Sequence, residues 1–256
     1  KKFINRSTKA VYELGSVFKT FTLAAGLQEN VIEVNTMFEN LPKKLKCAGS
    51  SISEYDMDIP SSLTAEEILI RSGNIGSIKI AQKVGLENYR KFLEDLDLLN
   101  KTQFDIDEIG TPISFKWGKC KLATSAYGHG ITTTPLQLAK AYAIISNGGY
   151  KIRPTLLKKK EDLKKREQII SENNSKKINN ILRKIVTSEE GTANLANIPG
   201  HEIAGKTGTA QKSIGGKYSK KKINTFASIF PISSPKYVLI VILDEPKLSK
   251  DYVYSY

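Results

Sequence analysis

The pattern of apolar residues changes at Gly200, and this change constrains the fold more than any other feature of the sequence. Beyond it, three short segments rich in β-branched, aromatic or small residues are separated by turns with lysine or proline, which predicts strands. They are HEIAGKTGTAQ (201–211), INTFASIFP (223–231) and YVLIVILDE (237–245). Because helical patterns fill mainly 13–190 and strands mainly 201–245, we predict an α+β fold, with an antiparallel sheet flanked by a cluster of helices.

Four segments before residue 190 have the spacing or the end signals of helices. Residues 13–30 are apolar nearly all round after Gly15, which indicates a buried helix. Residues 63–85 open with Thr64 and Glu67 at capping-box spacing, break at residues 72–74, and resume from about Ile75. The other two helices are predicted over 132–149, between Thr134-Pro135 and Asn147-Gly148, and over 176–186, where apolar residues recur every three or four positions.

Length and composition indicate a globular domain. A chain of 256 residues can bury a sizeable core, and we treat residues 1–256 as one domain. The longest apolar run, YVLIVIL (237–243), has the length of a strand, so we expect neither a membrane-spanning helix nor a signal peptide within the chain.

The net charge of +13 comes largely from lysine runs at 157–167 and 216–224. Tyr218 is the one aromatic residue in these two runs, and they match no nucleic-acid module. We therefore expect solvated surface and no nucleic-acid partner, with attraction to an anionic polymer or a membrane face as the alternative.

Cysteine and histidine are scarce. Cys47 and Cys120 are far apart in the sequence and form no Cys-x-x-Cys pattern, so we expect neither a disulfide framework nor a metal site. His129 and His201 are too scattered for a zinc site, and a Ser-His-Asp triad would have to use one of them. We expect no metal and no cofactor.

Ser16 and Lys19 form a Ser-x-x-Lys pair near the start of the first predicted helix. Residues i and i+3 share a helical face, so the hydroxyl and the ammonium can come within hydrogen-bond reach. A serine hydroxyl is a poor nucleophile unless a base takes its proton, and a lysine amine can serve when apolar surroundings lower its pKa. Alone, the pair is weak evidence, because Ser-x-x-Lys occurs by chance in most chains of this length.

Ser72-Gly73-Asn74 lies on the predicted loop between two helices. Its hydroxyl can pass a proton between Lys19 and a leaving group, and its amide can hold a substrate amide. An ordinary capping turn is the alternative for this tripeptide considered alone.

The stretch AGKTGTAQ (204–211) is predicted to lie on an edge strand, although alone it also fits a turn. Gly205 and Gly208 would let a substrate backbone approach closely. Lys206 and the hydroxyls of Thr207 and Thr209 can bind a carboxylate. The backbone N–H of Thr209 can join that of Ser16 as a two-donor oxyanion hole.

Together, Ser-x-x-Lys, Ser-x-Asn and Lys-Thr-Gly in this order make up the signature set of active-site serine enzymes that bind penicillins. The chain resembles the class B penicillin-binding proteins, most closely the division-type (septal) peptidoglycan transpeptidases. The resemblance runs from residue 12 to residue 211, over the stretches YELGSVFKTFTLAAGL, LTAEEILIRSGNIGSIKIAQKVG, YGHGITTTPLQLAKAYAIISNGGY and GTANLANIPGHEIAGKTGTAQ.

The resemblance implies a transpeptidase or serine β-lactamase-like fold and a role for each motif. Ser16 would attack the D-Ala-D-Ala carbonyl of a stem peptide, expel D-Ala, and pass the acyl group to an amine of a neighbouring stem peptide. β-Lactam antibiotics would acylate the same serine. The implied assistants are Lys19 as base, Ser72 as proton shuttle, Asn74 as holder of a substrate amide, and Lys206, Thr207, Gly208 and Thr209 as the carboxylate site.

The chain also departs from the family pattern. Thr20 stands where a proline is common, and His129 where glutamine is usual, so we assign His129 no catalysis. The family's sheet includes strands before the Ser-x-x-Lys helix and a strand and helix after DEP (244–246), so we expect a fragment truncated at both ends. We then expect an inner-membrane anchor outside this chain, a periplasmic catalytic domain, and a membrane glycosyltransferase and division proteins as partners.

Other members of the wider group are weighed by single features. Class A β-lactamases add a glutamate and an asparagine at i and i+4, but no Glu-x-x-x-Asn lies between residues 90 and 115. A β-lactam sensor domain keeps the nucleophile, but TTTPLQLAKAYA and GTANLA resemble the biosynthetic enzymes. An elongation-type transpeptidase is the closest alternative, and it often has aromatic residues where this chain has Gly130-Ile131-Thr132.

Overall fold

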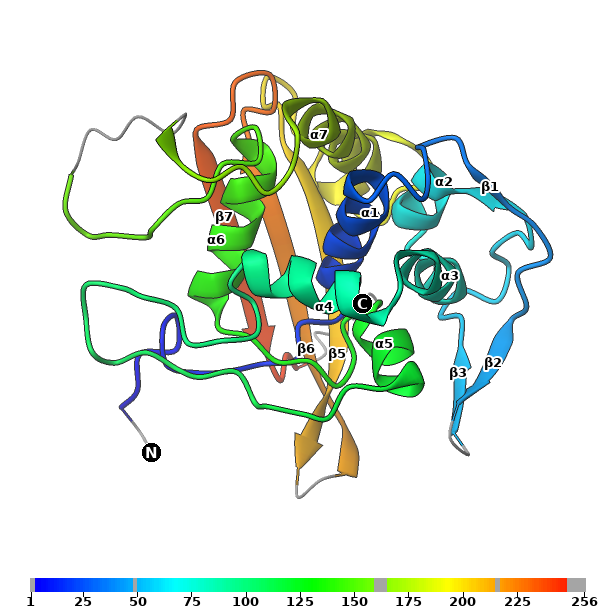
Figure 1. Cartoon of the computed structure of the whole chain (residues 1–256), viewed down its shortest axis with the longest axis horizontal. Helices are drawn as coiled ribbons and strands as arrows, with labels where there is room; N and C mark the ends of the chain where they lie inside the picture. Colours follow the sequence, from blue (N-terminus) through cyan, green and yellow to red (C-terminus); the bar gives the residue numbers. More distant parts are fainter. Residues whose placement is uncertain (1–2, 48–49, 159–164, 215–216, 248–256) are drawn as a thin grey trace.

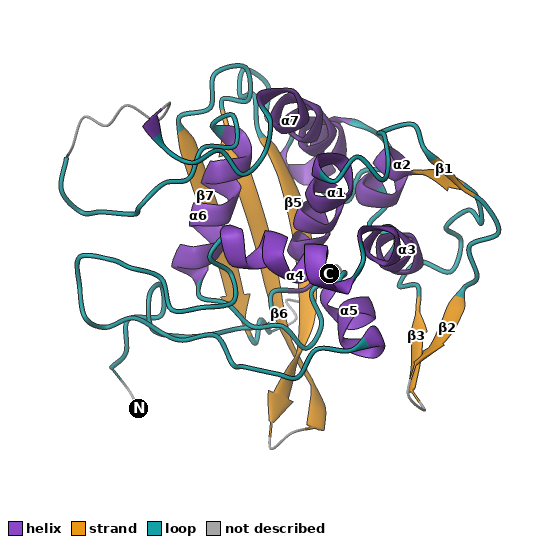
Figure 2. Ribbon diagram, in the orientation of Figure 1, coloured by secondary structure: helices purple, strands orange, loops and turns teal. Residues whose placement is uncertain are grey.

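The computed structural model describes residues 3–47, 50–158, 165–214 and 217–247. In this part of the chain, helices gather on one face of a three-stranded sheet, and a small hairpin lies to one side (Figures 1 and 2). The helices are α1 (Lys19–Gln28), α2 (Ala65–Ile70), α3 (Asn74–Val84), α4 (Leu86–Asp95), α5 (Lys119–Ser125), α6 (Pro135–Ser146) and α7 (Glu172–Thr187), with 3-10 turns η1 (Gly15–Phe18) and η3 (Asn194–Ala196). The strands are β1 (Met37–Phe38), β2 (Lys44–Cys47), β3 (Ser50–Ser53), β4 (Leu63–Thr64), β5 (Ala204–Ile214), β6 (Lys217–Phe230) and β7 (Tyr237–Asp244). No helix among the described residues is long and apolar enough to cross a membrane.

The main sheet is antiparallel with the order β5-β6-β7, so β5 is an edge strand, as predicted. Its register pairs Lys206 with Ala227, and Thr225 with Ile242. β6 is longer than predicted, because the lysine-rich segment that was assigned to exposed surface continues the strand and pairs with the end of β5. Lysine is tolerated there because alternate side chains of the β6 segment point to solvent. The other lysine run lies largely outside the described residues, which omit 159–164.

Two small sheets were not predicted. β1 pairs with β4, and β2 pairs with β3, both antiparallel. Their strands are two to four residues long, which is too short for an alternating pattern to stand out. The β2–β3 hairpin nevertheless matters for function, because its last residue, Ser53, and the following Glu54 accept hydrogen bonds from the start of α3, directly after the Ser72 loop.

The predicted helix ends are confirmed in detail. The Thr64 hydroxyl accepts a bond from the Glu67 N–H at 3.2 Å, and the Glu67 carboxylate accepts one from the Thr64 N–H at 2.7 Å. Thr134 and Gln137 form the same reciprocal cap at the start of α6. α3 starts at Asn74, one residue earlier than predicted, and α4 and α5 had no counterpart in the sequence analysis.

α1 runs through the core of the molecule. Nine of its ten residues, Lys19 to Leu27, are buried, which confirms the buried helix expected over 13–30. Phe21 meets the rings of Phe18 and Tyr142 edge to face, at 5.5 and 5.4 Å between centroids. The Tyr142 hydroxyl also donates to the Val17 carbonyl at 3.0 Å. The residues at the N-terminal end of α1 are therefore held in place by packing and by hydrogen bonds.

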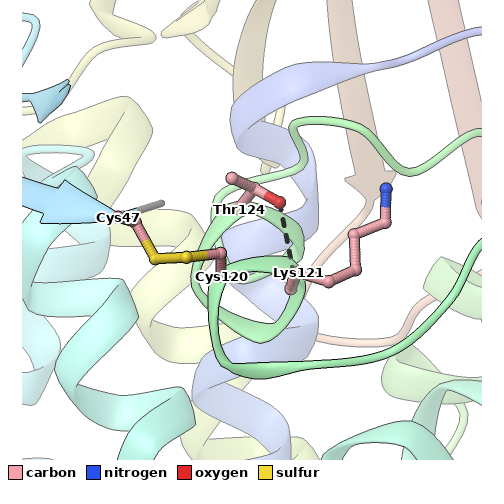
Figure 3. Close-up of a disulfide and its surroundings, with 4 residues drawn as sticks. All are labelled: Cys47, Cys120, Lys121 and Thr124. Carbon is pink, nitrogen blue, oxygen red and sulfur yellow. Dashed lines mark hydrogen bonds between the residues drawn. A yellow bond between two sulfur atoms is a disulfide. The ribbon is translucent and has the colours of Figure 1, made fainter. Parts of the chain in front are cut away.

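The expectation that the two cysteines stay unpaired was wrong. Cys47 in β2 and Cys120 in α5 form a disulfide, with their Cα atoms 5.5 Å apart (Figure 3). The two residues are 73 positions apart, and separation in sequence says nothing about distance once the chain has folded back. The bond ties the β2–β3 hairpin to α5.

Candidate active site

A cleft of about 1120 Å³ brings the three predicted motifs together. One side is formed by the start of η1 and by β5, and the other by the loop between α2 and α3. Residues 54–57, 127–129 and 190–196, with Ile59 and Phe226, complete the lining. The motif residues that line it are Ser16, Ser72, Asn74, Thr207, Gly208 and Thr209.

Two glycines let η1 lie directly on the backbone of β5. Gly15 has φ +64°, and a Cβ there would lie 2.4 Å from the Thr209 carbonyl oxygen. A Cβ on Gly208 would lie 2.4 Å from the Leu14 carbonyl oxygen. The close approach that Gly208 permits is thus to η1 rather than to a substrate. This packing places Ser16 next to Thr209, so the two predicted oxyanion donors belong to adjoining backbone segments.

Gly205 also serves the packing of the sheet. A Cβ there would lie 2.6 Å from the Ala227 carbonyl oxygen and 2.8 Å from the Phe226 ring. Protein atoms therefore fill the space that we had assigned to a substrate backbone.

Lys19 reaches the Ser72 loop rather than Ser16. Its ammonium donates to the Ser72 carbonyl and, at 3.1 Å, to the Ser72 hydroxyl. In the described ranges, no hydrogen bond joins Ser16 to Lys19, although the two residues are three positions apart. The lysine is almost fully buried, so its charged end is placed by the neighbouring loop and not by solvent.

Lys206 approaches the same hydroxyl from the sheet. Its ammonium donates to the Ser72 hydroxyl at 2.9 Å and to the Thr207 carbonyl at 3.0 Å, and its side chain is completely buried. A hydroxyl oxygen has two acceptor positions, and in Ser72 these serve the two lysines. The structure thus joins one residue from each of the three motifs through a single oxygen atom.

The two buried ammonium groups are difficult to keep charged together. Burial lowers the pKa of Lys19 to about 7, and the nearby Glu54 carboxylate opposes that shift. Burial, and then the charge of Lys19, lower the pKa of Lys206 well below its ordinary value. Near neutral pH the pair therefore holds fewer than two protons, and one amine is available as a base.

Glu54 is a site residue that the sequence analysis missed. It is buried, and its two carboxylate oxygens accept bonds from the N–H groups of Asn74 at 2.6 Å and Ile75 at 2.8 Å. It thus caps the positive end of α3 and fixes the position of the Ser72 loop. No local signal points to it, because it follows a short strand in a segment without periodicity.

Asn74 and the threonines of β5 have partners of their own. The Asn74 amide donates to the Ser53 carbonyl at 2.8 Å, so part of its bonding capacity is used within the protein. The hydroxyls of Thr207 and Thr192 lie 2.7 Å apart. Side chains alternate along a strand, so Thr207 and Thr209 face the cleft while Lys206 lies on the opposite face of β5.

The groups that the cleft offers for chemistry are a serine hydroxyl, lysine amines and backbone N–H donors. Across the ranges that the structure describes, no group of three His, Cys, Asp or Glu residues could hold a metal ion. A hydroxyl nucleophile, buried amines and backbone N–H donors are the chemical equipment of acyl transfer.

The sequence and the fold resemble those of known proteins. Residues 1–255 match the penicillin binding protein transpeptidase domain. The "Probable peptidoglycan D,D-transpeptidase FtsI" of Caulobacter vibrioides is 31% identical over 95% of this chain and 43% of its own length. The "Stage V sporulation protein D" of Bacillus subtilis is 33% identical over 93% of this chain and 39% of its own. The chain thus spans less than half of either relative.

A solved structure supports the same relationship. The transpeptidase (TP) domain of penicillin-binding protein 3 from Burkholderia pseudomallei superposes with a TM-score of 0.87 at 27% identity, over 94% of this chain and 74% of that one. The match includes the helical cluster and the antiparallel sheet, which confirms the predicted α+β fold. From its sequence and its fold, the chain belongs to the penicillin binding protein transpeptidase domain family.

Proposed function

We propose that this chain is the catalytic domain of a peptidoglycan D,D-transpeptidase and that Ser16 carries the acyl group. One observation carries the proposal: Lys19 and Lys206 share the Ser72 hydroxyl in the cleft that Ser16 lines. Several relatives are named as probable peptidoglycan D,D-transpeptidases, which supports the same activity.

In the first half-reaction, the Ser16 hydroxyl attacks the carbonyl of the terminal D-Ala-D-Ala bond. Lys19 in its neutral form takes the proton, and a pKa of about 7 leaves a large neutral fraction near pH 7. The N–H groups of Ser16 and Thr209 stabilise the oxyanion. Ser72 then gives its proton to the departing D-Ala nitrogen and takes one from the Lys19 ammonium, to which its hydroxyl is bonded.

The terminal carboxylate of the donor is held by β5. The Thr207 and Thr209 hydroxyls face the cleft, and the charge of Lys206 lies beneath them in the strand. Asn74 offers its remaining amide capacity to the peptide. A cleft of about 1120 Å³ is large enough for several residues of a stem peptide.

The cellular role is a further part of the proposal. The resemblance of the motif stretches favours septal synthesis, with an inner-membrane anchor, a glycosyltransferase and division proteins acting through regions outside this chain. The Cys47–Cys120 disulfide supports an oxidising compartment such as the periplasm. The alternative is an elongation-type enzyme. Depletion in the source bacterium separates the two, since a septal enzyme is required to divide and an elongation enzyme to keep the cell's shape.

Labelling with a fluorescent penicillin tests the chemistry. The full-length protein is expected to form a covalent adduct that disappears in Ser16→Ala and persists in Ser62→Ala, a matched change at an exposed serine outside the cleft. Adduct formation in Ser16→Ala would overturn the assignment of the nucleophile. Rapid release of the hydrolysed antibiotic by the unmodified protein would favour a β-lactamase instead.

A further inference from the structure

Glu13 and His129 form a pair at the boundary between the catalytic cleft and a second cavity. His129 lines the cleft, whereas Glu13 lines the neighbouring cavity of about 510 Å³. The His129 Nδ1 atom lies 3.9 Å from the Glu13 Oε2 atom. The proton transfers described above involve neither residue.

The backbone places His129 close to the nucleophile. A Cβ on Gly128 would lie 1.9 Å from the Gly15 carbonyl oxygen, so residues 128 and 15 are in direct backbone contact. Ser16 and His129 are the next residues in these two segments, and both line the cleft. The His129 N–H donates to the Thr124 carbonyl at 3.0 Å, which anchors the segment to the end of α5.

Aromatic rings hold the imidazole. The Tyr127 ring stacks on His129 with 5.7 Å between centroids, and the Tyr218 ring lies 4.3 Å away. Glu13 is fixed as well, because its Oε2 atom accepts the Gly130 N–H at 2.8 Å and its two oxygens share the Tyr218 hydroxyl at 3.3 Å. The His129 side chain remains 30% exposed, so it can exchange a proton with solvent.

The charges around His129 suit a neutral base. Burial lowers its pKa, and so does Lys121, whereas Glu13 raises it. The other titratable groups against the ring are the hydroxyls of Tyr127 and Tyr218, whose pKa values burial raises, so they stay protonated. The imidazole is thus neutral at pH 7, and a carboxylate stands ready to stabilise the imidazolium.

The second half-reaction needs such a group. As an amine attacks the acyl-enzyme, its nitrogen becomes acidic and must lose a proton. Lys19 is neutral again once its proton has passed through Ser72 to the departing D-Ala, but its amine is buried and bonded to the Ser72 loop. A base in the segment 127–129, which lies next to Ser16 and is partly open to solvent, can take the proton of an amine that enters from that side of the cleft.

We propose that His129, oriented by Glu13, is the base for the acceptor amine, an inference that rests on the proposed transpeptidase function. The amine nitrogen bonds to the acyl carbon and gives its proton to His129. The bond from that carbon to the Ser16 oxygen breaks, and the oxygen takes the proton from the imidazolium, which Glu13 stabilises until then. His129 and Ser16 thereby return to their starting states.

The test separates the two half-reactions in the full-length protein. A thioester analogue of the stem peptide forms the acyl-enzyme, D-alanine serves as the acceptor amine, and mass spectrometry gives the ratio of aminolysis to hydrolysis product. In His129→Gln this ratio is expected to fall about tenfold or more, and in Glu13→Gln less. The rate of acylation by fluorescent penicillin is expected to change by a smaller factor than the ratio. His201→Gln, at an exposed histidine outside the cleft, is the matched control.

Each outcome decides the matter. An unchanged ratio in His129→Gln would overturn the proposal, and so would a loss of acylation as large as the loss of aminolysis, which would assign the pair to folding or to the first half-reaction. A protein that shows no Ser16-dependent acylation would instead refute the transpeptidase function, and this inference would fall with it.

Discussion

Among the described residues, buried lysines occur in two regions, and their hydrogen-bond partners differ. On α6, the Lys140 ammonium is 2.7 Å from an Asp97 carboxylate oxygen, and Thr102 donates to the same oxygen at 2.7 Å. In the cleft, the hydrogen bonds of Lys19 and Lys206 go to hydroxyl and carbonyl oxygens only. The Lys140 ammonium is thus hydrogen-bonded to a carboxylate, whereas the Lys19 and Lys206 ammonium groups are not.

The different hydrogen-bond partners indicate a structural role for Lys140 and a chemical role for the lysines of the cleft. A buried ammonium that is paired with a carboxylate fixes the elements that it joins, and removal of either partner leaves an uncompensated buried charge. A buried ammonium bonded only to neutral groups bears the cost of desolvation, and this lowers its pKa into the range where it can exchange protons. We therefore expect substitution of the cleft lysines to change activity and substitution of Lys140 on α6 to change stability.

The largest effect is expected for Lys19→Met. Acylation by fluorescent penicillin should fall about 1000-fold, because the base for Ser16 is lost. Stability should rise, since no ammonium remains to be buried. Because the pKa of Lys19 is about 7 in the folded protein and 10.5 when unperturbed, the unfolded chain binds more protons than the folded one between these pH values. The free energy of unfolding of the wild type therefore increases as the pH rises from 7 to 10.5. The stability advantage of Lys19→Met is accordingly greatest below pH 7. Acylation kinetics and denaturant unfolding measure the two effects. A near-normal acylation rate in Lys19→Met would contradict the assignment of Lys19 as the base for Ser16.

Lys140→Met is the matched change in the other region. The free energy of unfolding should fall by about 3 kcal/mol, because the substitution leaves Asp97 without its cation. Acylation of the folded protein should change little, since Lys140 is outside the cleft. An acylation defect that persists under conditions where the variant is fully folded would contradict the division of roles.

The next largest effect on stability is expected for removal of the Cys47–Cys120 disulfide. The disulfide joins β2 to α5, and these elements lead to Glu54 and to residues 127–130, two parts of the site. Replacing Cys47 and Cys120 with serine should lower the free energy of unfolding by about 2 to 3 kcal/mol. The acylation rate should fall too, unlike in Lys140→Met. Equal stability of the oxidised and the reduced wild type in urea would count against this role.

The sequence predicted the parts of the site that are contained in short motifs. Ser16, Ser72 and Lys206 could be found because each lies in a three- or four-residue pattern, and the patterns gain force from their order. The caps at Thr64 and Thr134 were equally accessible, since a cap depends on residues three positions apart.

Contacts between distant segments had no such signal. Nothing near Glu54 in the sequence indicates that its carboxylate meets the N-terminus of α3, and nothing near Cys47 indicates Cys120. The expected bond between Ser16 and Lys19 followed from helical spacing alone, whereas the long lysine side chain instead extends to Ser72. Such errors are inherent in local reasoning, because the fold decides which of several reachable partners a flexible side chain meets.

The smallest effect, and the most selective, is expected for Glu54→Gln. Glu54 raises the pKa of Lys19 against the effect of burial, so loss of its charge should lower that pKa below about 7. Acylation falls as Lys19 becomes protonated, and the acid limb of the pH–rate profile should therefore move to lower pH. Glutamine also keeps one acceptor oxygen for α3, so the rate at its plateau should drop by only about tenfold, near the cost of one charged hydrogen bond.

The pH profile distinguishes an electrostatic role from a structural one. If Glu54 only held the Ser72 loop, the variant would lose rate equally at every pH and the inflection would stay in place. Glu39→Gln, at an exposed glutamate, controls for the change in net charge. A shift in Glu54→Gln alone would mean that the Glu54 carboxylate tunes the pKa of Lys19 from a distance, without hydrogen-bonding to it. The contrast with Lys140 would then depend on direct contact with a carboxylate, and not on the presence of one nearby.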